Sequence, residues 1–266
     1  MERQEVIRSK IWEEVAEPDN PFAAAACYCH GYDVYGDLLG KASWTEYLYL
    51  LFRGSRASPK QVKLLEGLSI AVANLGPRDH AVNAAMNGGA GGSTYASCLM
   101  AALAVGAGQL GGAHEVALAM SCWLICGNDL SLWKEHITNS PREERADIWL
   151  PIEHAPGFDP NGVSCSAPVR QALSHLSTHS EGGALPWLAR YRGALEETAG
   201  YPLAITGVAA ATLMDLGFTP EQGEMAYLLL RLPGAAVHAL EQEQYGHRQF
   251  PFFANGLVLQ DDPGPQ

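Results

Sequence analysis

Signals that begin and end α-helices recur along this sequence and constrain its fold more than any other feature. Ser43 stands three residues before Glu46, which is the spacing of a capping box, and Gly54 follows the apolar run as a stop signal. The segment from Ser58 repeats this plan with a proline in its first turn, and another such segment begins at Thr219. We find no run of alternating valine, isoleucine and threonine that would indicate a strand. The sequence therefore predicts an all-α fold.

Composition narrows the classes of function. The chain has 266 residues, of which 47% are hydrophobic and only 17% charged, so we expect a compact core and apolar surface left for a partner chain. The net charge of −12, without a lysine or arginine run, argues against nucleic-acid binding. No stretch reaches about 18 consecutive apolar residues, and the N-terminus lacks an apolar signal region. We therefore expect a cytoplasmic protein with no nucleic-acid or membrane partner.

Two motifs look like cofactor sites but are better explained otherwise. The glycine-rich run from Asn87 follows a helical segment and lacks both GxGxxG spacing and a Walker lysine, so close helix packing is favoured over phosphate binding. The next segment, TYASCLMAALAVGAG, then reads as a buried central helix. Cys27, Cys29 and His30 have no second ligand pair at zinc-finger spacing, so we expect no metal.

Two further features raise the question of function. The longest irregular region, residues 143–168, carries four prolines, and loops of that length in compact chains are usually functional or disordered. Arg231 lies on the apolar face of LLLRLPG, where an unpaired guanidinium would be costly, so it needs an anionic partner. That partner is either a structural carboxylate or a ligand carboxylate at the helix interruption predicted from Pro233 and Gly234.

Six segments occur in an order typical of one superfamily. They are GYDVYGDLLGKASWTEYLYLLFRG, ASPKQVKLLEGLSIAVANLGP, GGSTYASCLMAALAVGAGQLGGAHEVAL, PGFDPNG, PLAITGVAAATLMDLGF and RLPGAAVHALEQ. Over almost the whole chain, these segments resemble the citrate synthase superfamily and, within it, the short citryl-CoA lyase-like proteins.

The resemblance implies a largely helical, citrate synthase-like architecture. Residues 1–117 and 209–266 would form a large domain and 118–208 a smaller one, with the active site in the cleft between them. The ligands would be coenzyme A or an acyl-CoA as substrate and a di- or tricarboxylic acid, without a metal. The assembly would be a homodimer, or a heterodimer with a citrate synthase-like paralogue. In the family, an aspartate takes a proton from the thioester α-carbon, one histidine donates to the enol and another polarises the oxo-acid carbonyl.

The sequence departs from the family pattern at each acid/base position. GQLGGAHE aligns with a motif like GPLHGGANE but lacks the catalytic histidine, and His114 takes the place of the asparagine. Pro160 stands where the carbonyl-polarising histidine is expected, and Thr206 stands where the base is expected. Leu75 occupies the position of a binding histidine. Because a threonine hydroxyl is not ionised near neutral pH, the ordinary condensation should be badly impaired.

Other residues could replace the lost groups. His114, Asp159 and His154, all at or near the relevant motifs, are candidate acid/base groups beside Thr206. The substrate carboxylates would bind Arg231, which matches a carboxylate-binding arginine, and Arg248, which matches one that reaches into the neighbouring subunit's site.

The coenzyme A contacts are carried over from the loop that contains the PGF motif. Gly157, Phe158 and Arg170 are the matching or near-matching positions. Three functions stay open: a CoA-thioester lyase or synthase with altered chemistry, a non-catalytic subunit that pairs with an active paralogue, and a sensor for a carboxylate or CoA compound.

Overall fold

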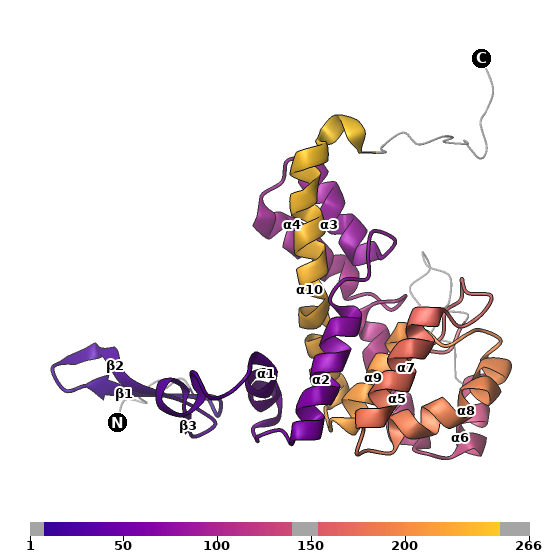
Figure 1. Cartoon of the computed structure of the whole chain (residues 1–266), viewed down its shortest axis with the longest axis horizontal. Helices are drawn as coiled ribbons and strands as arrows, with labels where there is room; N and C mark the ends of the chain where they lie inside the picture. The colour runs from indigo at the N-terminus through magenta and orange to yellow at the C-terminus, as the bar shows by residue number, and fades with distance from the viewer. Residues whose placement is uncertain (1–7, 140–153, 251–266) are drawn as a thin grey trace, which may run out of the picture.

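The structure, a computed structural model, describes residues 8–139 and 154–250, and these are mainly helical (Figure 1). The helices are η1 (Val34–Leu38), α1 (Trp44–Arg53), α2 (Pro59–Val72), α3 (His80–Ala90), α4 (Tyr95–Gly106), α5 (Ala113–Cys126), α6 (Leu130–Asn139), α7 (Ala167–His179), α8 (Ala184–Ala199), α9 (Ile205–Asp215), α10 (Pro220–Tyr245) and η2 (His247–Gln249). None of these described helices is long and apolar enough to cross a membrane.

A small antiparallel sheet corrects the all-α prediction. Its strands are β1 (Trp12–Glu17), β2 (Asn20–Cys29) and β3 (Tyr32–Asp33), in the order β1-β2-β3. The sheet projects from the helical body as an arm (Figure 1). The prediction was wrong because β1 and the first part of β2 are solvent-exposed and β2 is rich in alanine, a helix former, so neither shows apolar alternation in the sequence. The Pro18-Asp19 pair, which lies at the turn between β1 and β2, was a sequence signal that could have indicated a hairpin.

The helix caps predicted from the sequence are present at the predicted residues in the structure. Ser43 and Glu46 form a capping box at the start of α1, and Gly54 ends that helix with a φ of 69°. The segments from Ser58 and Thr219 also begin with capping boxes, each with a proline in the first turn. Local hydrogen bonds between neighbouring residues thus define these helix starts.

The described residues bury two hydrophobic clusters of different size. The larger cluster joins α1, α2, α5, α7, α8, α9 and the first half of α10 around long side chains such as Leu65 and Leu68. The smaller cluster joins α3, α4 and the second half of α10. Its members are Ala81, Val82, Ala85, Cys98, Ala102, Ala235 and Ala239.

Small residues let the helices of the smaller cluster approach closely. A Cβ at Gly89 of α3 would lie 2.4 Å from the carbonyl oxygen of Ala239 on α10. Helix α4, however, is not the buried central helix expected from its composition. It buries only Cys98, Ala102 and Gly106, because its other face meets no part of the described chain.

Helix α10 passes unbroken through the predicted interruption, which is a second correction. Pro233 lies inside the helix, and the Gly234 N–H donates to the Ala73 carbonyl oxygen at 2.7 Å, just beyond the end of α2. A Cβ at Gly234 would lie 2.5 Å from that same oxygen, so glycine is needed for this contact. The tertiary hydrogen bond and the packing on both sides maintain the helix despite the proline.

Candidate active site

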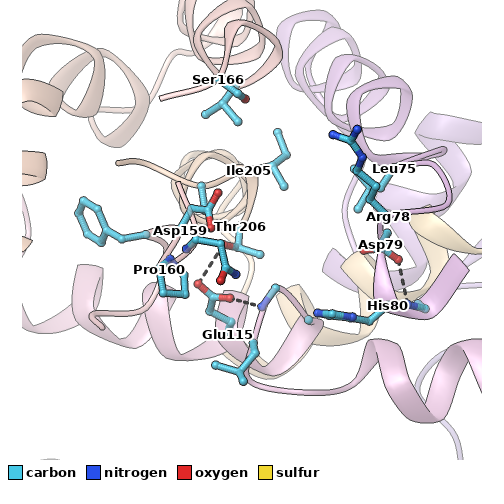
Figure 2. A pocket seen from close by; sticks show the side chains of 18 of the residues that line it. Leu75, Arg78, Asp79, His80, Glu115, Asp159, Pro160, Ser166, Ile205 and Thr206 are labelled. Atoms are coloured by element: carbon cyan, nitrogen blue, oxygen red, sulfur yellow. Dashed lines mark hydrogen bonds between the residues drawn. The ribbon is translucent and has the colours of Figure 1, made fainter. Parts of the chain in front are cut away.

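A cavity of about 350 Å³ opens where five separate segments meet. Its walls come from the turn before α3, the glycine loop before α5, the loop at 158–166, the start of α9 and the middle of α10. Figure 2 shows two groups of polar side chains in it. Glu115, Thr206 and Asp159 lie together on one side, and Arg78, Asp79 and His80 lie across from them.

Arg231 of α10 lies in the wall of this cavity and is 5% exposed. Its Nη2 forms an ion pair with the carboxylate of Asp79. Its Nη1 is 3.3 Å from the carbonyl oxygen of Gly111, and its guanidinium lies 5.2 Å from the ring centroid of Tyr227. The anionic partner that the sequence demanded is therefore present as a structural carboxylate.

Asp79 connects that ion pair to helix α3. Its Oδ1 accepts the backbone N–H groups of Ala81 and Val82 at 3.0 and 3.1 Å, so it is the N-cap of α3. Its neighbours Arg78 and His80 are exposed at the cavity rim. Among the described residues, Arg78 forms no ion pair, so this side of the cavity carries positive charge available to an anionic ligand.

Glu115, in the first turn of α5, is the most buried acidic side chain of the cavity at 2% exposure. Its Oε2 accepts the Gly111 N–H at 2.6 Å. Its Oε1 accepts the Gly157 N–H at 2.8 Å and the Thr206 hydroxyl at 3.1 Å. Burial raises the pKa of Glu115 above its ordinary value, and the three hydrogen bonds, which favour the ionised form, only partly oppose this.

His154 lies beside Glu115 but outside the cavity lining. Its Nε2 is 4.0 Å from Oε1 of Glu115, which is too long for a hydrogen bond. Burial lowers the pKa of His154, and the negative charge of Asp159 opposes this only in part. Since burial favours the neutral form of both side chains, we describe them as neighbours and not as a salt bridge.

The PGF motif is held against the start of α9 by its backbone. Gly157 has a φ of 91°, and a Cβ there would lie 2.9 Å from the Cα of Gly207, so both positions favour glycine. Phe158 forms an isolated β-bridge with Leu203, and the Asp159 N–H donates to the Pro202 carbonyl oxygen at 2.8 Å. These contacts bring Phe158 and Asp159 to the cavity beside Thr206.

The structure thus brings together many, but not all, of the positions singled out in the sequence. Those that line the cavity are Leu75, Phe158, Asp159, Pro160, Thr206 and Arg231. Gly157 supports the cavity through its backbone, as described above.

Three other predicted residues lie elsewhere in the chain. The Nδ1 of His114 lies 3.3 Å from Oε2 of Glu224 on α10, and His114 does not line the cavity. Arg170 of α7 donates to the Cys165 carbonyl oxygen and lines a separate pocket that is more open to solvent. Arg248 is exposed on η2, beyond the C-terminal end of α10.

Four titratable lining residues were not among the sequence candidates: Glu115, Arg78, Asp79 and His80. The sequence offered weak signals for them. Asp79 is a good N-cap residue before an alanine-rich segment, and Glu115 follows a run of glycines at the entrance of a helix. Both features are also expected of ordinary helix starts, so neither indicates a ligand. Within the described parts of the chain, no group of three or more His, Cys, Asp or Glu side chains could hold a metal ion.

Comparison with known proteins was informative only at the level of structure. No family model matches the sequence, and no curated protein matches it. The structure is similar to citryl-CoA lyase from Hydrogenobacter thermophilus, with a TM-score of 0.74 and 16% identity over 98% of this chain and 96% of that one.

Larger enzymes contain a similar unit. ATP citrate lyase from Methanothrix soehngenii, solved with citrate and coenzyme A, matches at a TM-score of 0.72 and 16% identity over all of this chain and 44% of that one. Citrate synthase from the thermophilic archaeon Thermoplasma acidophilum matches at 0.57 and 15% over 85% and 58%. The chain therefore has a citrate synthase-like fold, and among these proteins the citryl-CoA lyase also matches it in length.

Proposed function

We propose that this protein acts on a CoA thioester and a di- or tricarboxylic acid, making or breaking a carbon–carbon bond with acid/base groups that differ from those of the family it resembles. One observation carries the proposal. Phe158 and Asp159, Thr206 and Arg231 come from three separate parts of the sequence, were all singled out from the sequence, and line one cavity. Such convergence of a few polar groups in a partly apolar pocket is typical of a ligand site.

The charges of the cavity suit a substrate with several carboxylates. Arg78 and His80 at the rim and Arg231 in the wall provide cationic or hydrogen-bonding groups on one side. Asp79 already neutralises Arg231, so we assign the larger share of carboxylate binding to Arg78. A planar guanidinium can hold a carboxylate by two parallel hydrogen bonds.

The thioester would enter from the side of the PGF loop. In this assignment, Gly157 and Phe158 face the pantetheine arm and Arg170 contacts a more distant part of coenzyme A. The known relatives in structure support this ligand class, because ATP citrate lyase from Methanosaeta concilii was solved with (3S)-citryl-CoA. That structure matches this one at a TM-score of 0.71 with 14% identity, over 99% of this chain and 43% of that one.

We also propose that the chain is divided into a large domain, residues 1–117 with 209–266, and a small domain, residues 118–208. Residues of the cavity come from both, with Glu115 and Arg231 on the large domain and Asp159 and Thr206 on the small one. Both bounds fall inside helices, α5 and α9, so opening and closing of the site would require these helices to bend. In a dimer, Arg248 would be supplied to the neighbouring subunit.

A non-catalytic subunit is the second candidate, because Leu75, Pro160 and Thr206 line the cavity at positions where the resemblance expects acid/base or binding groups. Such a subunit would need a surface for its partner. The face of α4 and α10 turned away from the rest of the chain exposes Met100, Val237 and Leu240. An apolar face of this kind is expected of an obligate partner surface. A pure sensor would use the same cavity without turnover.

The first experiment is binding and turnover by the purified protein. Calorimetry would measure binding of citryl-CoA, acetyl-CoA and a panel of di- and tricarboxylic acids, and ultraviolet absorbance would follow thioester cleavage or formation. We expect binding and slow turnover, with affinity for the carboxylic acid reduced by about tenfold or more in Arg78→Gln.

Arg190→Gln is the matched control, because Arg190 is an exposed arginine on α8 that does not line the cavity. Binding without turnover would identify a subunit or sensor. Absence of binding to every thioester and acid would contradict the proposed function.

A further inference from the structure

We propose that Glu115 is the group that exchanges a proton with the α-carbon of the thioester, and that the Thr206 hydroxyl positions its carboxylate. This inference rests on the proposed function. It concerns a residue to which the resemblance assigns no acid/base role, on the opposite side of the cavity from the carboxylate-binding cations.

The position of the Glu115 carboxylate is the first support. The resemblance places the family's base at Thr206, whose hydroxyl cannot accept a proton from carbon. That hydroxyl donates to Oε1 of Glu115 at 3.1 Å, and both side chains line the cavity. A carboxylate is therefore present within one hydrogen bond of the place where the chemistry needs it, supplied by α5 instead of α9.

The hydrogen bonding of Glu115 leaves it able to react. A carboxylate has about four acceptor positions. Oε1 uses two of them on Gly157 and Thr206, and Oε2 uses one on Gly111. These three donors fix both oxygens, while one acceptor position on Oε2 has no partner among the described residues. A carboxylate held in this way loses little freedom when it binds a proton.

The surroundings of Glu115 favour exchange near neutral pH. Burial raises its pKa, and the titratable groups around it are His154, Asp159 and Tyr227. His154 is held neutral by burial, and the negative charge of Asp159 raises the Glu115 pKa further. A carboxyl group whose pKa lies closer to the working pH is both a better base and a better acid than an exposed glutamate.

The other candidates are less well placed. His114 points to Glu224 and does not line the cavity, and His154 lies behind Glu115. Asp159 does line the cavity, but it is half-buried on a loop, and its Oδ1 accepts the Asn161 N–H at 2.9 Å as part of a local turn. Glu115, on a helix, is held by hydrogen bonds from Gly111, Gly157 and Thr206, which are more than the structure gives to any of the other three side chains.

The step balances in both directions. In cleavage, the carbinol hydroxyl gives up its proton to solvent water as the bond between the thioester α-carbon and the carbinol carbon breaks, and the electron pair of that bond forms the thioester enolate. The protonated Glu115 then gives its proton to the α-carbon and is left as a carboxylate, which regains a proton from solvent. In formation, the Glu115 carboxylate removes a proton from the α-carbon, the enolate attacks the oxo-acid carbonyl, and the resulting alkoxide takes a proton from solvent water. No oxidant or further reactant is needed.

Hydrogen–deuterium exchange at the thioester α-carbon isolates this proton transfer. Acetyl-CoA would be incubated with the protein in D2O, with and without an oxo-acid, and loss of the α-protons followed by NMR. We expect exchange by the wild type and a decrease of about 10²- to 10⁴-fold in Glu115→Gln. Glu66→Gln is the matched control, because Glu66 is an exposed glutamate on α2 outside the cavity.

A second variant tests the proposed positioning role of Thr206 while it leaves Glu115 in place. Thr206→Val keeps the side-chain shape but removes one donor to the carboxylate. We expect a smaller decrease, of about tenfold, and a shift of the exchange midpoint to higher pH, because the ionised form loses a hydrogen bond. Binding of acetyl-CoA, measured by calorimetry, should remain in both variants.

The outcomes separate this inference from the proposed function. If the wild type binds no thioester, the proposed function fails and the inference fails with it. If the wild type turns over a thioester but shows no exchange, or if Glu115→Gln exchanges within about threefold of the wild type, the proposed function stands and Glu115 is only structural. If the wild type binds a thioester but neither exchanges nor turns it over, the protein is a subunit or sensor and the inference fails. A Thr206→Val profile with an unchanged midpoint would exclude the positioning role.

Discussion

The two hydrophobic clusters of this protein differ in kind as well as in size. The larger one is built from leucines, tryptophans and other long side chains contributed by most of the helices, and it resembles the core of an independent domain. The smaller one consists of alanines, one valine and one cysteine between α3, α4 and the second half of α10. Its helices are close together but bury little apolar area.

The difference indicates two sources of stability. Burial stabilises a fold by about 25 cal/mol for each Å² of apolar surface, so the larger cluster can support its helices alone. The smaller cluster leaves Met100, Val237 and Leu240 exposed on the outer face of its helices. We therefore expect that this region is completed by another chain, and the candidate site lies where the two regions meet.

The largest expected effect comes from the ion pair that joins the two regions. Asp79→Asn leaves the buried Arg231 guanidinium without a counter-charge and should lower the free energy of unfolding by roughly 3–5 kcal/mol. Chemical denaturation would measure the change. The double variant Asp79→Asn with Arg231→Met should recover much of the loss, because no unpaired charge remains. Equal losses in the single and double variants would show that the ion pair does not couple the regions.

The next largest effect comes from truncating buried side chains, and it compares how much each cluster contributes to the free energy of unfolding. Leu68→Ala on α2 removes a fully buried side chain and should cost roughly 2–5 kcal/mol. Val82→Ala on α3, also buried, should cost only about 1.5 kcal/mol, because it removes less apolar volume from a thinner cluster. Denaturation curves of the two variants would give both values. Similar losses would mean that the regions are equally well packed.

A substitution on the exposed face of α10 should have the smallest effect on the stability of the single chain. It should, however, have a clear effect on assembly. Leu240 is 46% exposed, so Leu240→Glu should change the free energy of unfolding of the monomer by no more than about 0.5 kcal/mol. Sedimentation should nevertheless show a shift from dimer to monomer. Leu132→Glu on α6 is the control, since Leu132 is similarly exposed at 44% but belongs to the body. A wild type that is monomeric would refute the expected partner surface.

Sequence reasoning succeeded where structure is local. Ser43, Ser58 and Thr219 each cap a helix through residues three positions away, so their effect can be read from a short window. The sheet escaped prediction because β1 and the first part of β2 lie in solvent, and only Cys27 and Cys29 at the end of β2 are buried. The continuity of α10 also escaped, since the Gly234 N–H is satisfied by Ala73, which is far away in the sequence.

Prediction of the candidate site was also limited to what nearby residues in the sequence indicate. The sequence identified Arg231 as a buried charge needing an anion, and that inference required only its apolar neighbours. It did not single out Glu115, because the partners that make this residue unusual, Gly157 and Thr206, lie 42 and 91 residues further along the chain. The resemblance identified the positions of the motifs. It could not identify contacts that form only in the folded chain.

The proline inside α10 has a mechanical consequence. Pro233 has no N–H to donate, and Gly234 gives its own to Ala73, so the helix is weakest in bending at this point. With a rise of about 1.5 Å per residue, Tyr245 lies about 18 Å beyond Pro233, and a bend of about 10° would move it by about 3 Å. Arg231, two residues from the pivot, would move by only about 0.5 Å. Helix α10 can therefore act as a lever that swings its outer end while holding the guanidinium in the cavity nearly still.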